Sequence, residues 1–163
     1  MRRLLARTDA WLARVALLFF AGFLRCVVLQ VVFRYVLQAP LPWSEEVAVY
    51  LFVWSSLLTA AIVVGQNDHF SIAVLADRLG PGPRRVLDLV GVLLSIVFVL
   101  IIVWNGTWWS WRMASGLSPV LQLPQGAVYA IIPLAGAYML LHLGVRLGGL
   151  LRGPLDGDTR PPW

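Results

Sequence analysis

Four long apolar runs, separated by short polar connections, set the pattern of the chain. Each run is about as long as the roughly 20 residues that a helix needs to cross a hydrocarbon core. Proline and glycine clusters mark the boundaries, at 40–42, 80–83 and 119–124. The pattern predicts an all-α integral membrane protein with four transmembrane helices. We place the spans at about 11–37, 47–65, 86–111 and 125–151.

The composition agrees with this class. Of the 163 residues, 60% are hydrophobic and 13% are charged, and the mean hydropathy is +0.80. Soluble domains have roughly 45–50% apolar and 25% charged residues. Four spans use most of the length, so we expect a single membrane domain at 1–152 and no separate soluble domain. The polar, proline-rich segment 153–163 is expected to be a flexible tail.

The arginines predict how the helices are oriented. They cluster before the first run, between the second and third runs and after the fourth, whereas the other two connections hold almost none, and the chain has no lysine. By the positive-inside rule, both termini are predicted to be cytoplasmic. Residues 69–79 carry apolar positions at helical spacing and are predicted to form a short amphipathic interfacial helix between spans two and three. The isoelectric point near 10.3 therefore reflects orientation, and nucleic acid is not an expected partner.

The start of the second run, residues 41–46 with the sequence LPWSEE, places two adjacent carboxylates where the chain enters the membrane. Ser44 is predicted to cap this helix, and the helix dipole favours Glu45 and Glu46 in the first turn. Capping accounts for one acid, whereas two acids beside Trp43 favour a surface that contacts a partner. The two glutamates diverge by about 100° on a helix, so they do not form a catalytic pair.

Two arginines lie inside or at the edge of the first run. Arg25 is near its middle, about 15 Å from each surface at 1.5 Å per residue. It is expected to snorkel, to pair with Asp88 near the start of the third run, or to meet a partner subunit, and the sequence does not choose among these. Arg34 is expected either to pair with Glu45 or Glu46 across the short connection or to contact another subunit.

The two histidines, His69 and His142, raise the question of a haem or a metal ion. Two haem ligands would both have to lie in the bundle core. His69, however, follows a polar stretch beyond the second span, so we expect it at a membrane surface or a subunit contact. No cofactor and no metal site are predicted. The sequence also lacks the motifs of common hydrolases, zinc proteases and phosphate-binding loops, so the chain is not expected to be an enzyme.

Several other residues are assigned to packing. The tryptophans at 104–111, near the outer end of the third run, are typical of an aromatic belt at a membrane surface. In the fourth run, Gly144 and Gly148 form a small-xxx-small pair that predicts the close approach of another helix. Pro133 predicts a kink in the same run.

Four stretches of the chain carry a resemblance to a known family. They are QVVFRYVL at 30–37, LPWSEEV at 41–47, LFVW at 51–54 and the fourth run with its preceding loop at 117–134, and His69 stands before an apolar helix. Together these residues resemble the small membrane subunit of tripartite ATP-independent periplasmic (TRAP) transporters, the DctQ-like family. The W-S-E-E unit after F-R-Y-x-L is the most specific part of the match.

This resemblance implies a multi-pass subunit of the bacterial inner membrane. Its partners would be the lipid bilayer, a large membrane subunit that moves substrate with a sodium gradient, and a periplasmic solute-binding protein that delivers the substrate, commonly an organic acid. The small subunit would brace the large one and help to form the docking surface. The residues implied at these contacts are Arg34, Trp43, Ser44, Glu45, Glu46 and His69.

Two other functions are compatible with the residues alone. A membrane anchor for a redox complex would need haem or quinone, and a self-sufficient small-solute carrier would need a polar site near the membrane midplane. The four runs hold few charged residues and no interrupted helix lined with converging polar groups. An accessory role is therefore favoured, with the transport chemistry in another chain.

Overall fold

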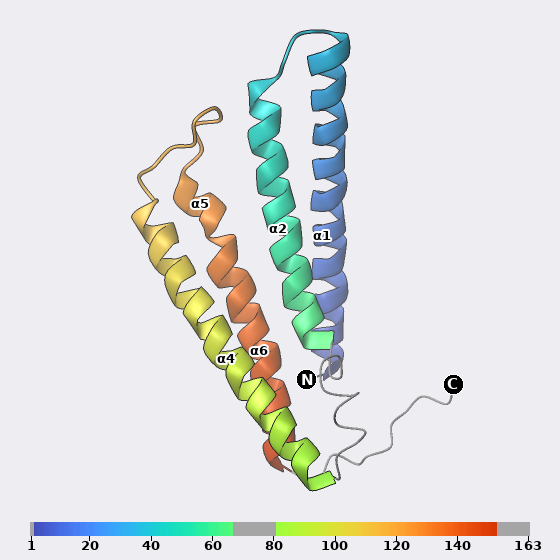
Figure 1. Ribbon diagram of the computed structural model, residues 1–163, viewed down its shortest axis with the longest axis vertical. Coiled ribbons are helices and arrows are strands. Elements are labelled where there is room, and N and C mark those ends of the chain that lie inside the picture. Colours follow the sequence, from blue (N-terminus) through green and yellow to red (C-terminus); the bar gives the residue numbers. More distant parts are fainter. Residues whose placement is uncertain (1, 67–80, 153–163) are drawn as a thin grey trace, which may run out of the picture.

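The computed structural model describes residues 2–66 and 81–152, and these residues are almost entirely helical (Figure 1). Four stretches are long and apolar enough to cross a membrane: Arg7–Val36, Pro42–Gly65, Val86–Arg112 and Gln125–Leu151. The described residues contain no strand beyond one isolated bridge, so the predicted all-α class with four spans is confirmed. The elements are α1 (Arg2–Val31), η1 (Val32–Val36), α2 (Pro42–Gln66), α4 (Pro81–Arg112), α5 (Gln125–Tyr129) and α6 (Ile131–Arg152).

Three helices, α1, α2 and α4, begin earlier than the apolar pattern predicts, and α4 starts at Pro81 and not at 86. α1 starts at Arg2, because the arginine-rich residues before the first apolar run continue the same helix. α2 starts at Pro42 and not at 47. Proline suits the first helical position, because its φ is already helical and the N–H that it lacks would have had no partner there.

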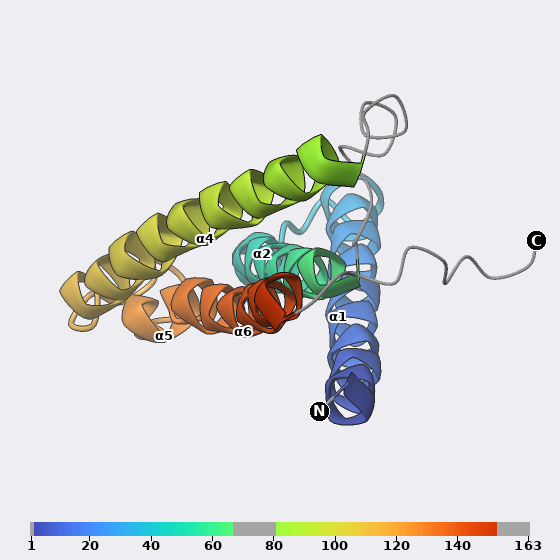
Figure 2. The same ribbon diagram turned by 90° about the horizontal axis from the view of Figure 1, so that it is seen from below.

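The four spans form two helix hairpins that meet along α2 and α6. α1 packs on α2, α4 packs on α6, and α2 lies between α1 and the other pair (Figure 2). The start of α1 and the end of α6, which are the two described ends of the chain, lie at the same end of the molecule (Figure 1). We refer to that end as the inner end. The opposite end, with the α1–α2 turn and the α4–α5 loop, is the outer end, and these names follow the predicted orientation.

Glycines allow α4 and α6 to approach closely. A Cβ on Gly106 of α4 would lie 2.5 Å from Cγ2 of Ile132, and a Cβ on Gly136 of α6 would lie 2.5 Å from Cγ2 of Val103. Each helix therefore inserts a β-branched side chain over a glycine of the other. The adjoining core holds Ala61, Val99, Ala135, Met139 and Leu143.

The fourth span is interrupted at Ala130, between α5 and α6. Pro133 has no N–H for the carbonyl of Tyr129, four residues earlier, and its ring crowds that carbonyl. The interruption falls where this missing hydrogen bond would be, so the helix in which Pro133 predicted a kink is interrupted at Ala130. α5 is tied to the rest of the molecule by Trp54, whose Nε1 donates to the carbonyl of Val128 at 3.1 Å.

Several expectations concern segments outside the described residues. The amphipathic interfacial helix and His69 fall within 67–80, and the tail falls within 153–163. These remain predictions from the sequence.

Candidate partner interface

The turn between α1 and α2 is held by Ser44, but not as the predicted helix cap. Ser44 is the third residue of α2, and its Oγ donates to the carbonyl of Leu41 at 2.7 Å. The carbonyl of Ser44 accepts a hydrogen bond from Nε2 of Gln30 on α1 at 2.8 Å. Ser44 is fully buried, so it fixes the turn from inside. The cap prediction was wrong because Pro42, two residues earlier, already serves as the first helical residue.

Arg34 and Glu45 form an ion pair across this turn, as one of the two sequence interpretations expected. Nη1 of Arg34 lies 3.6 Å from Oε1 of Glu45, and the two side chains are 63% and 67% exposed. An exposed pair of this kind contributes only roughly 0–1 kcal/mol to stability. Both charges therefore stay accessible at the outer end, and Trp43, in the first turn of α2, is 41% exposed.

Glu46 differs from its neighbour because its carboxylate is bound within the chain. Oε2 accepts hydrogen bonds from the backbone N–H groups of Val120 and Leu121 at 3.0 and 3.1 Å. Oε1 accepts one from the hydroxyl of Tyr50 at 2.6 Å. Glu46 thus connects α2 to the α4–α5 loop, and of the two acids it is Glu45 that the chain leaves exposed.

The α4–α5 loop has its own internal hydrogen bonds. The N–H of Ser118 donates to the carbonyl of Leu123 at 2.8 Å, and the N–H of Leu123 donates to Oγ of Ser118 at 3.0 Å. Gln122 adopts a left-handed backbone with φ of 55°, which closes the turn. Together with Glu46, these contacts give the outer end a fixed shape.

Tryptophans surround the outer end of α4. Trp104 and Trp111 are the most exposed, and the guanidinium of Arg112 lies 5.0 Å from the ring centre of Trp108. Exposed indoles at one end of a span are typical of the aromatic belt predicted from the sequence. We therefore assign these residues to the membrane surface and not to a ligand site.

Arg25 and Asp88 do not form an ion pair in the described part of the chain. Arg25 is exposed on α1, Asp88 is half-buried on α4, and the ion pairs among residues 2–66 and 81–152 join other side chains. A pairing of Arg25 with Asp88 is thus not formed within this part of the chain. The partner of Arg25 stays a prediction.

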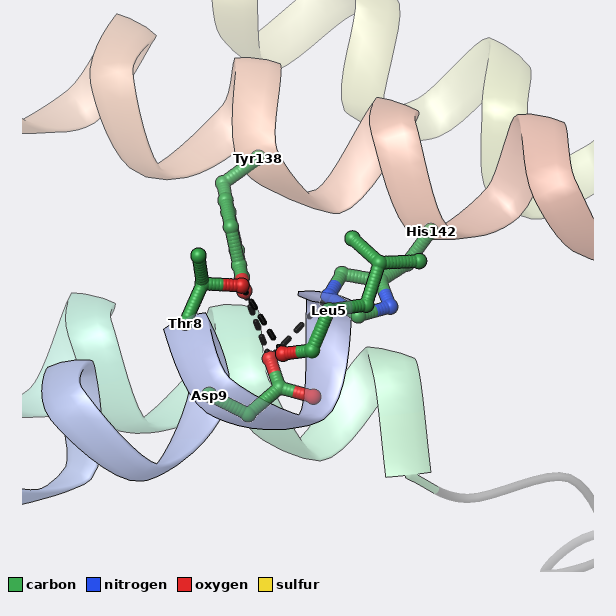
Figure 3. Close-up of polar contacts among 5 residues, drawn as sticks. All are labelled: Leu5, Thr8, Asp9, Tyr138 and His142. Atoms are coloured by element: carbon green, nitrogen blue, oxygen red, sulfur yellow. Dashed lines mark hydrogen bonds and ion pairs between the residues drawn. The ribbon is translucent and has the colours of Figure 1, made fainter. Parts of the chain in front are cut away.

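A polar cluster that the sequence interpretation missed joins α1 to α6 near the inner end (Figure 3). Oδ1 of Asp9 accepts a hydrogen bond from the hydroxyl of Tyr138 at 2.6 Å and lies 3.1 Å from Nε2 of His142. The hydroxyl of Thr8 lies 2.9 Å from that of Tyr138. The side chains of Asp9 and His142 are 12% and 8% exposed. We call these four residues the inner cluster.

The sequence contained a weak signal for the inner cluster. Tyr138 and His142 are four residues apart and so share one face of a helix, and Asp9 is seven residues before the buried Ala16. Asp9 was overlooked because it precedes the first apolar run. α2 also closes on the cluster, since a Cβ on Gly65 would lie 2.5 Å from Nδ1 of His142. Among the described residues, no group of histidine, cysteine and acidic side chains could hold a metal ion.

This geometry is that of a multi-span membrane protein with defined polar contacts at the two ends of its helices. Residues 23–153 match the family model of the DctQ component of tripartite ATP-independent periplasmic transporters. The chain therefore belongs to the DctQ family of TRAP transporters. Proteins of this family are small membrane subunits of transporters and not enzymes, so the resemblance seen in the sequence is confirmed.

Three relatives illustrate the match. A TRAP transporter small permease protein of Haemophilus influenzae is 30% identical over 122 residues, which cover 74% of this chain and 75% of the relative. The C4-dicarboxylate TRAP transporter small permease protein DctQ of Rhodobacter capsulatus is 37% identical over 118 residues, 71% of this chain and 52% of the relative. The isethionate TRAP transporter permease protein DctMQ of Oleidesulfovibrio alaskensis is 25% identical over 123 residues, 72% of this chain but 19% of that longer protein.

Proposed function

We propose that this chain is the accessory membrane subunit of an ion-gradient-driven TRAP transporter in a bacterial inner membrane. In this role it braces the large transport subunit, and its outer end helps to dock the periplasmic solute-binding protein. The transported solute is a small organic anion. The observation that carries the proposal is the DctQ family match over most of the chain.

The relatives support both the solute class and the large partner. Two of them are named for C4-dicarboxylate and isethionate, which are small organic anions. In DctMQ, the region similar to this chain is continuous with a much longer polypeptide. A small subunit and a large permease that occur in one chain in a relative are expected to assemble when they are separate chains.

The structure supports a bracing role through the position of its polar contacts. The inner cluster fixes α1 against α6 at one end, and Glu46 fixes the α4–α5 loop against α2 at the other. Secondary transporters instead place converging polar groups near the membrane midplane, on interrupted helices. The interruption at Ala130 lies toward the outer end of the fourth span, next to α5 (Figure 1).

Reconstitution tests the proposed function. The chain, a large TRAP subunit and a binding protein from the same transporter are placed in proteoliposomes, and sodium-driven uptake of an organic anion is measured. Uptake is expected only with all components, and the small and large subunits should co-purify. Uptake by this chain alone, or a haem absorbance band in the purified protein, would refute the proposal and favour a carrier or a redox anchor.

Glu45→Gln and Glu46→Gln separate docking from folding at the outer end. Glu45→Gln is expected to lower uptake roughly two- to fivefold, as for loss of an exposed charge contact, without changing the melting temperature of the subunit. Glu46→Gln is expected to lower the melting temperature, because its carboxylate accepts three hydrogen bonds within the chain. Unchanged uptake with Glu45→Gln would remove Glu45 from the docking surface.

A further inference from the structure

Three arginines lie in a row on one face of α1. Arg7, Arg14 and Arg25 are seven and eleven residues apart, which corresponds to about two and about three whole helical turns. All three side chains are exposed. Ala16, which is buried in the core that α1 shares with α2 and α6, is nine residues before Arg25 and so points to the opposite side of the helix. We call the outward side the arginine face of α1.

The rest of this face is apolar. Leu18, seven residues before Arg25, and Leu29, four residues after it, lie on the same side of α1 and are 70% and 36% exposed. Apolar side chains of this kind can face either lipid or another protein. The apolar side chains alone do not show whether this face contacts lipid or protein. Arg25, the charged residue at mid-span, distinguishes between these two possibilities.

Arg25 is too deep in the membrane to be left against lipid. It lies nine residues, or about 13 Å of helix, from Arg34 at the outer end, and eleven residues from Arg14 on the inner side. A guanidinium at mid-depth in hydrocarbon is costly, and membrane proteins usually turn such groups toward a protein partner or a wet cavity. Among the described residues, no ion pair is made by Arg25.

A second copy of this chain would not supply a negative charge or a hydrogen-bond acceptor to Arg25. In a symmetric dimer built on the arginine face, each residue contacts the equivalent surface of its partner. The two Arg25 guanidinium groups would then lie at the same depth and repel each other. A complementary surface therefore has to come from a different protein.

We infer that the arginine face of α1 binds the large TRAP subunit, which presents a carboxylate or free backbone carbonyl groups to Arg25. This inference rests on the proposed function and adds to it the face that makes the contact and the chemistry that the large subunit supplies. α4, whose outward residues Leu94 and Phe98 are each 65% exposed, carries no charged residue at that depth and faces lipid.

Photocrosslinking in the intact complex tests which face is covered. The single native cysteine is first removed by Cys26→Ala. In this background a new cysteine is placed on α1 by Leu18→Cys or on α4 by Leu94→Cys. Each variant is labelled with a thiol-reactive benzophenone. The label at 18 is expected to capture the large subunit, and the label at 94 to capture lipid. Capture of the large subunit from 94 only, or of lipid or a second copy of this chain from 18, would overturn the inference.

The charge itself is tested with Arg25→Leu and Arg25→Lys, with Arg14→Leu as the matched control on the same face. Arg25→Leu is expected to reduce the co-purified complex on the order of tenfold, since it leaves an acceptor of the large subunit unpaired. Arg25→Lys should retain more complex, and Arg14→Leu, close to the inner surface, should cost little. If Arg25 faces lipid, Arg25→Leu will instead leave the complex unchanged or raise its yield.

The two proposals fail in different ways. If the wild-type chain does not co-purify with a large TRAP subunit, the proposed function is wrong. If the complex forms and transports but Arg25→Leu assembles normally, the proposed function stands and the arginine face is not the contact. The melting temperature of the isolated subunit should not fall in Arg25→Leu, because Arg25 is exposed in the single chain.

Discussion

At the scale of single residues, the important polar side chains are those whose partners come from distant parts of the chain. Asp9 meets Tyr138 and His142, which lie about 130 positions later, and Glu46 meets the backbone of the α4–α5 loop. A buried carboxylate is tolerated when hydrogen bonds replace its hydration. These contacts therefore fix how the helices are aligned.

Tyr138→Phe tests the inner cluster. Loss of the hydroxyl removes one hydrogen bond to the buried Asp9 and one contact with Thr8, so the free energy of unfolding in mixed micelles should fall by about 1–3 kcal/mol. Tyr35→Phe, at a tyrosine that is 73% exposed, is the control and should have little effect. Equal stability of the two variants would mean that the inner cluster does not hold α1 to α6.

Of the local predictions, the ion pair across the α1–α2 turn is formed, whereas the cap predicted at Ser44 is not. The Arg34–Glu45 pair spans one short turn and could be expected from spacing. The different surroundings of Glu45 and Glu46 could not, because the loop that binds Glu46 is about 75 residues away. Asp9, whose partners are about 130 residues away, also lies before the first apolar run and so outside the pattern that marks the helices.

At the scale of the helices, glycine positions decide which pairs approach closely. The predicted pair Gly144 and Gly148 has open space around it, with nothing within 4 Å of an added Cβ among the described residues. Gly106 and Gly136 make the close contact between α4 and α6 instead. A small-xxx-small spacing predicts which face of a helix could accept a close neighbour. Whether a neighbouring helix packs on that face depends on the fold.

Substitution of these glycines should show the difference. Gly136→Ala is expected to cost about 1–3 kcal/mol in unfolding free energy, because its Cβ would meet the stiff Val103 side chain at 2.5 Å. Gly144→Ala, where the space is open, should be neutral or stabilising by up to about 1 kcal/mol through helix propensity. A loss at Gly144→Ala equal to that at Gly136→Ala would contradict this packing.

At the scale of the whole molecule, the two hairpins place both described ends on one side and the α1–α2 turn, which holds the proposed docking residue Glu45, on the other (Figure 1). The helices fix this arrangement, but the side of the membrane depends on the arginines. Because arginines cluster at the inner end, we expect that end to face the cytoplasm.

Cysteine labelling in intact spheroplasts tests the orientation. Ala39→Cys in the α1–α2 turn and Ser115→Cys in the α4–α5 loop, each with Cys26→Ala, are expected to react with a membrane-impermeant maleimide from outside. Arg7→Cys should react only after lysis. Labelling of position 7 in intact cells, with protection of positions 39 and 115, would reverse the topology and remove Glu45 from the docking surface.

The sequence by itself determined the class, the four spans and the family. Hydrophobic length and composition report on solvation by lipid, which acts on each segment separately, and the W-S-E-E unit is a local pattern. Only the tertiary structure decided that Ser44 is buried, that Glu46 binds a loop, that Asp9 meets α6, and that the arginine face of α1 points away from the other helices. All of these features depend on how the helices pack against one another, and no local pattern encodes that packing.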